Sequence, residues 1–289
     1  MRRLVHFTTS LLQKCLSAIK RASLRCGRSV LLLQPASNES LRNFFALMRP
    51  VTTEHRLVRI GGDSDGGYLV PDDFADLRAC FSPGVCTTVA FEKDLASRDI
   101  RSYMIDASIE SLPEENPLFC FERKFVGVFD GPRDTTLSSW MAAHECNAGD
   151  LMLQMDVEGS EFGVLLSTDA DALRRFRIMV IEFHNLDLVF SQLGCDLLTV
   201  VFQRLLTLHS IVHIHPNNFS SPVRRGSYLV PPTMEFTFLR NDRIRERRPA
   251  IAFPHPQDRP NDRHERDYPL PHCWFIADDP SHHRPIDAG

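Results

Sequence analysis

Carboxylate side chains follow a short apolar run in the middle of the chain. The run Leu151 to Met155 ends at Asp156 and Glu158, and Gly159 permits a tight turn directly after them. The run is too short for a helix and indicates a buried parallel strand. Ligands of open α/β sheets bind outside the carboxyl ends of the strands, so Asp156 and Glu158 lie where chemistry is expected.

The residues after this turn predict the start of a helix. Ser160 is a suitable N-cap, and Glu161 brings negative charge to the first turn, where the helix dipole favours it. We therefore expect Glu161 to stabilise the helix.

A second apolar run, Ile178 to Phe183, ends at His184 and predicts a strand that is buried on both faces. Side chains alternate along a strand, so Glu182 and His184 point to the same side. Because the pKa of histidine lies near neutral pH, His184 is a candidate general base, with Asp156 orienting the substrate. The alternative is a capping or core histidine that is paired with Glu182 or His215.

Carboxylates and imidazoles also suit a divalent cation, which would lower the pKa of a bound hydroxyl. The available side chains come from three predicted strands and have no diagnostic spacing, so we predict no metal ligand. This alternative set is Asp156, Glu182, His184 and His215.

A glycine turn follows an earlier strand. Ala79 to Phe81 predicts the strand, Ser82 to Gly84 the turn and Val89 to Arg98 a helix, an order found at nucleotide sites. Asp106 ends the next strand, Ser102 to Ile105, about twenty residues after the turn, where an acid binds ribose hydroxyls. An aspartate in this position is otherwise a helix cap.

Two glycine pairs, Gly61-Gly62 and Gly66-Gly67, surround Asp63 and Asp65 before the strand Tyr68 to Val70. A hairpin turn is the simpler interpretation and a ligand-binding loop the alternative. The other predicted elements are a helix at Leu41 to Met48, a strand at Leu57 to Ile60, a third sheet strand at Lys124 to Phe129 followed by Asp130, a helix at Leu137 to His144, a turn at Ala170 to Phe176, one long helix within Leu186 to Leu208, a strand at Ile211 to Ile214, and a closing strand pair at Tyr228 to Val230 and Met234 to Leu239.

Composition indicates one principal domain, because 289 residues with 43% hydrophobic content can bury one large core. The net charge of -4 argues against a nucleic-acid partner. Eight dispersed cysteines without metal-site spacing are typical of a reduced, cytoplasmic protein.

The first 38 residues contain seven Lys and Arg and no acid, and their apolar positions follow a helical stripe. No stretch of this arm is long and apolar enough for a secretory signal or a membrane span. Peripheral contact with an anionic membrane through residues 1–38 is one interpretation, and a solvated or domain-packed extension is the other. From Asn241 the chain becomes rich in Arg, Pro and His; this tail either wraps the domain, since Trp274 and Phe275 need packing partners, or is partly disordered.

The motifs RIGGDSDGGYLVP, CFSPGVCTTVAFEKDLA, LQMDVEGSEFGVLL, VIEFHNL, HIHPNN and MEFTFLR, in this order, resemble the FkbM-like methyltransferases that use S-adenosylmethionine. The similarity covers roughly Arg59 to Arg240. It implies an α/β fold with a doubly wound, seven-stranded, Rossmann-like class I methyltransferase sheet whose last strand is antiparallel. We therefore predict a basic helical extension at residues 1–50, the methyltransferase domain at 51–240 and a Pro/Arg/His-rich tail at 241–289.

The resemblance also implies site residues. The turn that contains Ser82 and Gly84 would pass beneath the methionine and ribose, and Asp106 would bind the ribose hydroxyls. Asp130 would face the adenine edge, and Asp156 and Glu158 would border the methyl donor. This chain has Cys86 where the family often has a second glycine, so a Cβ could crowd the cofactor.

The predicted function is methylation of a small-molecule or sugar hydroxyl, with His184 and Asp156 as the catalytic residues. The alternative is a non-catalytic binding protein that kept the fold and lost the donor site.

Overall fold

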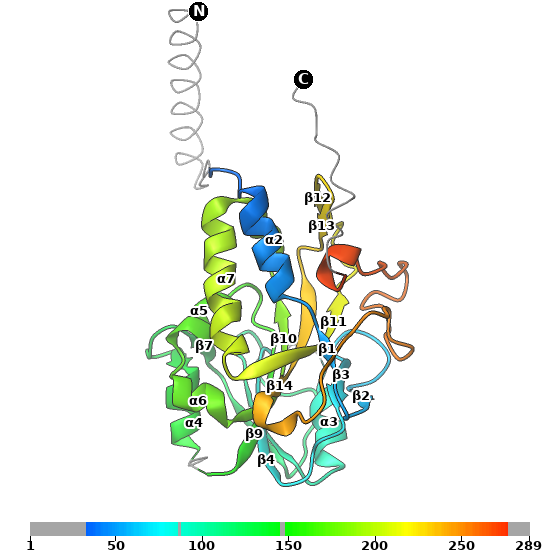
Figure 1. Cartoon of the computed structure of the whole chain (residues 1–289). Helices are drawn as coiled ribbons and strands as arrows, with labels where there is room; N and C mark the ends of the chain where they lie inside the picture. The colour runs from blue at the N-terminus through cyan, green and yellow to red at the C-terminus, as the bar shows by residue number, and fades with distance from the viewer. Residues whose placement is uncertain (1–32, 86–87, 145–147, 277–289) are drawn as a thin grey trace, which may run out of the picture.

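A seven-stranded sheet forms the centre of the molecule in the computed structural model, which describes residues 33–85, 88–144 and 148–276 (Figure 1). Within this part of the chain the strands lie in the order β6-β5-β4-β9-β10-β14-β11, and β14 is antiparallel to both of its neighbours. The other neighbouring pairs are parallel, so the predicted fold is confirmed. The strands are β4 (Leu77–Pro83), β5 (Arg101–Ile105), β6 (Phe119–Glu122), β9 (Asp150–Met155), β10 (Phe176–Phe183), β11 (His209–Pro216) and β14 (Met234–Arg240).

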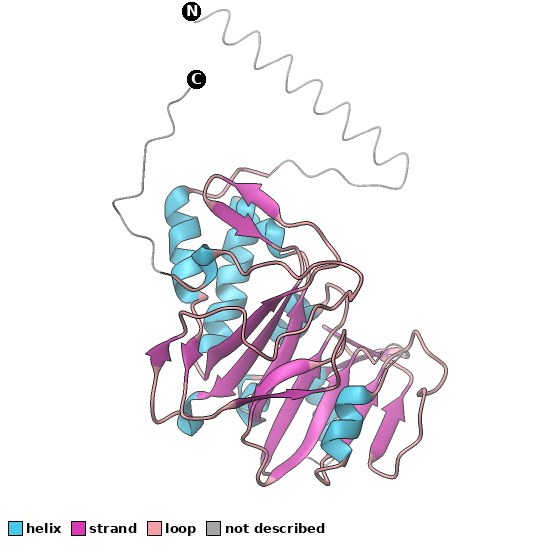
Figure 2. Cartoon of the chain, turned by 90° about the vertical axis from the view of Figure 1, so that its right-hand side faces the viewer, coloured by secondary structure: helices cyan, strands magenta, loops and turns pink. Residues whose placement is uncertain are grey.

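Helices cover both faces of the sheet, as Figure 2 shows. One face packs against α3 (Ala90–Ala96) and a hairpin of β2 (Leu57–Ile60) and β3 (Tyr68–Pro71), which confirms the hairpin interpretation of the glycine-rich segment. β10 and β11 are buried along their whole length because both of their faces are covered. The opposite face packs against α2 (Asn38–Leu47), α4 (Leu137–Ala143), α5 (Glu161–Ser167), α6 (Ala170–Arg175) and α7 (Gln192–Leu206).

Two segments that we predicted as strands of the main sheet lie outside it. The third sheet strand is β6 rather than Lys124 to Phe129, a segment of which only β7 (Phe125–Gly127) forms a strand, paired with β8 (Asp134–Thr136) outside the main sheet. Its apolar composition was misleading, because Val128 and Phe129 are exposed. Likewise β13 (Tyr228–Val230) pairs only with β12 (Val223–Arg225).

Helix boundaries also differ from the prediction. Leu186 to Leu208 is divided into a 3₁₀ helix, η1 (Leu186–Phe190), and α7, because Ser191 accepts a hydrogen bond from the Gly194 N–H (3.1 Å) and caps a new helix. The predicted turn after Thr168 is the short helix α6.

The tail wraps the domain as far as it is described. β15 (Arg248–Pro249) pairs with β1 (Val51–Thr52), and two 3₁₀ turns, η2 (Asn241–Arg243) and η3 (His272–Trp274), lie before and after it. Trp274 is fully buried against Phe44 and Phe45 of α2, so the Trp-Phe pair does find its packing partners.

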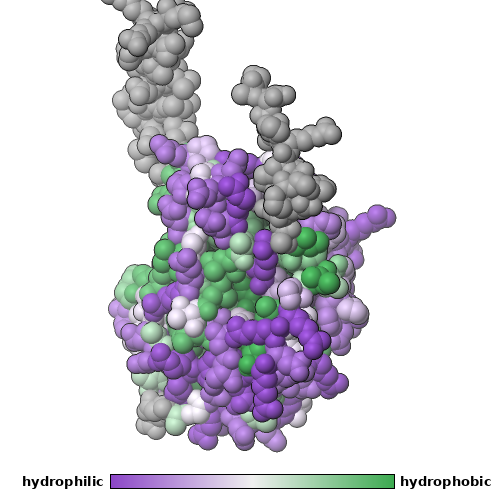
Figure 3. Space-filling model, in the orientation of Figure 1, coloured by the Kyte–Doolittle hydropathy of each residue, from purple (hydrophilic) through white to green (hydrophobic). Residues whose placement is uncertain are grey.

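The predicted basic arm lies largely outside the described residues, and the domain boundaries at residues 50 and 240 stay predictions. Among the helices that the structure describes, none has the length and apolarity to cross a membrane. Figure 3 shows apolar side chains over α2 and α7, and α7 exposes Leu193, Leu197 and Val200.

Candidate functional site

Three neighbouring strand ends meet at Gly84. Its N–H donates to the carbonyl of Ile105 (3.0 Å), and the Asp156 N–H donates to the carbonyl of Pro83 (3.1 Å). Gly84 has φ +90°, and a Cβ there would lie 1.5 Å from the carbonyl oxygen of Asp156, so only glycine fits. The turn therefore has Asp106 on one side and Asp156 on the other. Cys86 lies outside the described residues.

Asp106 lies at the end of β5, as predicted, and it caps no helix. Its Oδ1 accepts hydrogen bonds from the N–H (2.7 Å) and the hydroxyl (2.6 Å) of Ser108, an Asx turn. Within the described residues Oδ2 has no hydrogen-bond partner, which leaves one carboxylate oxygen for a ligand.

Ser82 belongs to β4 rather than to a turn, and its hydroxyl contacts the carboxyl of Glu92 and the side chain of Gln154. Burial raises the pKa of Glu92. Because the Ser82 side chain is fully buried in these contacts, it is not free to bind a cofactor.

Asp130 follows β7 and not a strand of the main sheet, which removes the structural premise for an adenine contact. Its carboxylate accepts bonds from the Thr136 N–H (2.8 Å) and the Ser139 hydroxyl (2.8 Å). These bonds lower the pKa of Asp130 and brace the first turn of α4. The exposed carboxylate thus has a structural role at this helix.

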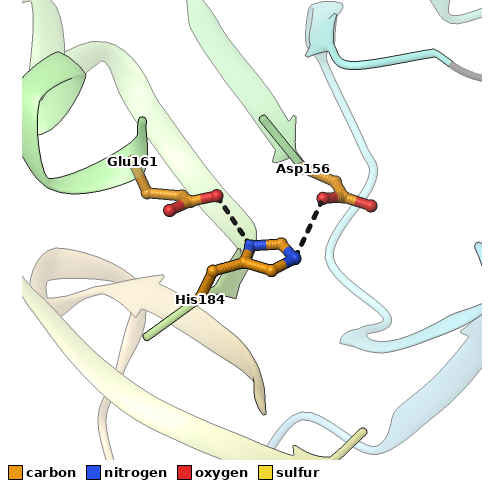
Figure 4. Close-up of side chains that lie close together, drawn as sticks. All are labelled: Asp156, Glu161 and His184. Atoms are coloured by element: carbon orange, nitrogen blue, oxygen red, sulfur yellow. Dashed lines mark hydrogen bonds and ion pairs between the residues drawn. The ribbon is translucent and has the colours of Figure 1, made fainter. Parts of the chain in front are cut away.

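His184 has a carboxylate at each ring nitrogen, as Figure 4 shows for Glu161 and Asp156. Nδ1 lies 2.9 Å from Oε1 of Glu161, and Nε2 lies 3.9 Å from Oδ1 of Asp156. Nε2 also lies 3.4 Å from Glu158 and 3.6 Å from Glu182. The predicted proximity of His184, Asp156 and Glu182 is confirmed, and the three come from adjacent strands.

Glu161 is the member of this cluster that sequence reasoning missed. Its side chain is 0% exposed, and its Oε1 accepts the Gly159 N–H (2.9 Å) as well as the bond from His184. Ser160 is the N-cap residue of α5 but makes no capping hydrogen bond with its side chain. The signal in the sequence was an acid at the first position of a helix whose next residues, Phe162 and Val164, are core residues.

Burial and neighbouring charges shift the pKa values of Asp156, Glu182 and His184. Burial raises the pKa of Asp156 to about 7, with His184 opposing the shift and Glu158 adding to it. Burial also raises the pKa of Glu182 well above its usual range. Burial acts to lower the pKa of His184, but the bond to Glu161 and the charges of Asp156 and Glu158 outweigh it and raise that pKa. Perturbed groups of this kind gather at functional sites.

A second polar network continues the first along the carboxyl edge. Asn217 donates to Glu182 (3.0 Å), and Asn261 of the tail donates to Glu235 (2.7 Å), the residue opposite Glu182 on β14. His215 has both nitrogens next to carboxylates, Nε2 at 3.0 Å from Asp267 and Nδ1 at 3.5 Å from Glu235. His215 is therefore engaged elsewhere and does not complete the alternative metal set.

A second set of side chains carries donor atoms that suit a cation. Asp156, Glu161 and His184 each place one possible ligand atom within 4.8 Å of the others.

A protein-family model matches part of the chain. Residues 102–210 match the family model described as the methyltransferase FkbM domain, a stretch that contains Asp106, Asp156 and His184 but not Gly84. No curated protein sequence matches the chain. A solved structure from Thermoplasma acidophilum, described as that of a putative methyltransferase, shares 8% identity and a TM-score of 0.31 over 65% of this chain and 85% of its own. The strand order of the main sheet is what establishes the fold.

Proposed function

We propose that the chain, whose residues 102–210 match the methyltransferase FkbM domain, transfers a methyl group from S-adenosylmethionine to a hydroxyl of a small molecule or sugar. The observation that carries this proposal is the meeting of three strand ends at Gly84. A donor-binding turn and a cluster that can activate an acceptor are adjacent there.

The residues around Gly84 fit a sulfonium donor that carries a ribose. Oδ2 of Asp106 suits a ribose hydroxyl, and the carboxylates of Asp156 and Glu158 suit a positive charge nearby. Ser82 and Asp130 contribute less to this fit than the sequence predicts, because their side chains are already bonded within the protein. When bound, the donor supplies an electrophilic methyl carbon.

The protein must then hold an acceptor oxygen in line with that carbon and remove its proton. Asp156 and His184 are the residues that we propose for this task. Nε2 of His184 faces Asp156, while Nδ1 is held by Glu161, so the ring orientation is fixed. Two roles are open to Nε2: it takes the proton itself, or it holds a cation that acidifies the hydroxyl.

Donor binding tests the proposal. In a calorimetric titration with S-adenosylmethionine, Asp106→Ala should weaken binding by about 1.5 to 3 kcal/mol. Asp106→Asn is the sharper variant, because an amide oxygen can keep both bonds to Ser108 while the free carboxylate oxygen is lost. Ser108→Ala serves as the control and should retain most of the affinity. Unchanged affinity in both Asp106 variants would remove the donor assignment.

The second candidate is a non-catalytic binding protein. The observation that favours it is that the Ser82 hydroxyl, near the end of β4, is hydrogen-bonded to Glu92 and Gln154. This side chain therefore does not contribute to a donor site. Absence of binding heat for the unmodified protein at millimolar donor would support this candidate.

We propose that the protein is cytoplasmic, that it has no nucleic-acid partner, and that residues 1–38 contact a membrane peripherally. The net charge supports the second point, and the basic arm supports the third. The exposed Leu193, Leu197 and Val200 of α7 add apolar surface beside α2, which follows the arm directly.

A further inference from the structure

Carboxyl groups outnumber basic groups around His184. Four carboxylates, those of Asp156, Glu158, Glu161 and Glu182, lie within 4 Å of its ring nitrogens. In the described part of the chain, neither lysine nor arginine forms an ion pair with any of the four. One imidazolium supplies at most a single positive charge, and buried charges without partners are costly.

Three oxygens of this cluster are buried and lack a hydrogen-bond partner among the described residues. They are Oδ1 of Asp156, Oε2 of Glu161 and Oε2 of Glu182. Glu161 and Glu182 are almost completely buried, so bulk water does not satisfy them. Protonation would remove charge but would add O–H donors that need partners in turn, so a bound cation explains the unpartnered oxygens of Asp156 and Glu182 better.

The distances suit a cation on the Nε2 side of the ring. Ligand atoms that each lie about 2.1 Å from one ion are separated by roughly 3 to 3.6 Å. Nε2 of His184 lies 3.6 Å from Oε1 of Glu182 and 3.9 Å from Oδ1 of Asp156, so small side-chain movements would close the site.

Glu161 lies on the opposite side of the ring, as Figure 4 shows. Its bond to Nδ1 fixes the proton on that nitrogen and leaves Nε2 as a lone-pair donor. A carboxylate behind a histidine ligand is the usual arrangement at metal sites, where it orients the ring and increases its basicity.

We propose that Nε2 of His184 and the carboxylates of Asp156 and Glu182 bind one divalent cation, with Glu161 orienting the imidazole. One imidazole with carboxylates suits Mn²⁺ or Mg²⁺. If the proposed function holds, the cation binds the acceptor hydroxyl and lowers its pKa, so its proton leaves more readily.

Calorimetric titration of the full chain with MnCl₂, after EDTA treatment and without donor, tests the site. We expect one Mn²⁺ per chain. Asp156→Asn, Glu182→Gln and His184→Ala should each weaken binding by at least about tenfold. The two amide variants keep side-chain size, so they carry the test if His184→Ala fails to fold. His144→Ala is the matched control, because His144 also contacts a carboxylate, that of Glu122, outside the cluster.

Absence of Mn²⁺ binding up to millimolar concentration would overturn the cation site, as would unchanged affinity in the folded ligand variants. A donor titration in EDTA separates the two proposals. Mn²⁺ binding without S-adenosylmethionine binding would contradict the proposed function and support the cation site. S-adenosylmethionine binding without Mn²⁺ binding would support the proposed function and contradict the cation site.

Discussion

The His184 side chain links the strand ends to the proposed chemistry. Whether Nε2 takes the proton or holds a cation, His184→Ala removes the group that activates the acceptor. We expect the rate of methyl transfer to fall by roughly two to four orders of magnitude. Donor affinity should hardly change, because Asp106 and the Gly84 turn are untouched. Initial rates with a methyl-labelled donor and a hydroxyl acceptor, beside a donor titration, measure both; a fully active variant would contradict the assignment.

Glu161 is predicted to act through His184. In Glu161→Gln the side chain keeps its size but loses the charge that contributes most to raising the pKa of His184, so that pKa should fall even though Asp156 and Glu158 remain. Titration of the imidazole by NMR in EDTA measures the shift, and Mn²⁺ affinity should fall about tenfold or more. Glu158→Gln is the comparison, since the Glu158 side chain is 84% exposed and water screens its charge. An unchanged His184 pKa in Glu161→Gln would leave Glu161 with a purely structural role.

The sequence predicted which side chains lie at the site better than it predicted which residues those side chains contact. Asp156 and His184 could be found because each interrupts an apolar run at a strand end. Glu161 was missed because an acid in the first turn of a helix already has a local explanation, and only the fold brings it to His184. The premise for Asp130 was wrong for a related reason, since its predicted position depended on a strand that lies outside the main sheet.

At the scale of elements, the close approach of β4 and β9 gives a testable prediction about Gly84. Gly84→Ala forces an alanine to φ +90° and pushes its Cβ into the Asp156 carbonyl. We expect a loss of about 2 to 4 kcal/mol in the free energy of unfolding, measured by urea denaturation. Gly62→Ala is the matched control, because Gly62 has the same φ with no atom within 4 Å of the added Cβ. Equal losses in the two variants would show that backbone strain alone matters.

The elements that were predicted correctly share one property: their burial pattern is visible in the sequence. β9 and β10 each contain a continuous apolar run, Leu151 to Leu153 and Ile178 to Ile181, and the hairpin of β2 and β3 carries its turn glycines. The Phe125 to Phe129 segment has the same composition, but its position on the surface depends on neighbours that are not local. The predicted long helix is interrupted at Ser191, which caps a new helix. The apolar pattern continues across this position, so the sequence did not reveal the interruption.

At the scale of the whole molecule, the tail closes over the carboxyl edge of the sheet. His213 pairs with Asp258 (2.9 Å) and His215 with Asp267 (3.0 Å), 45 and 52 residues further along the chain. The sequence indicated that Trp274 needs a partner, because a large aromatic side chain is rarely left exposed. The histidine–aspartate pairs could not be predicted, since no periodicity connects such distant residues.

The contacts of His215 with Asp267 and Glu235 predict how the free energy of unfolding depends on pH. Burial acts to lower the pKa of His215, but the carboxylates of Asp267 and Glu235 raise it to about 10. A folded-state pKa above the unfolded value of about 6.5 means that protonated His215 favours the folded state. This stabilisation is fully present below pH 6.5 and is lost as the pH rises toward 10.

We therefore compare the free energy of unfolding of the unmodified protein with that of His215→Gln, by urea denaturation at pH 6.5, 8 and 9.5. The variant should be less stable at pH 6.5, and the difference should shrink by up to about 3 kcal/mol toward pH 9.5, because only the unmodified protein loses a proton at this position. His264→Gln, the same substitution at an exposed position of the tail, is the control and should change the free energy of unfolding only slightly. A constant difference for His215→Gln across this range would mean that the tail is held by packing at Trp274 rather than by the charge of His215.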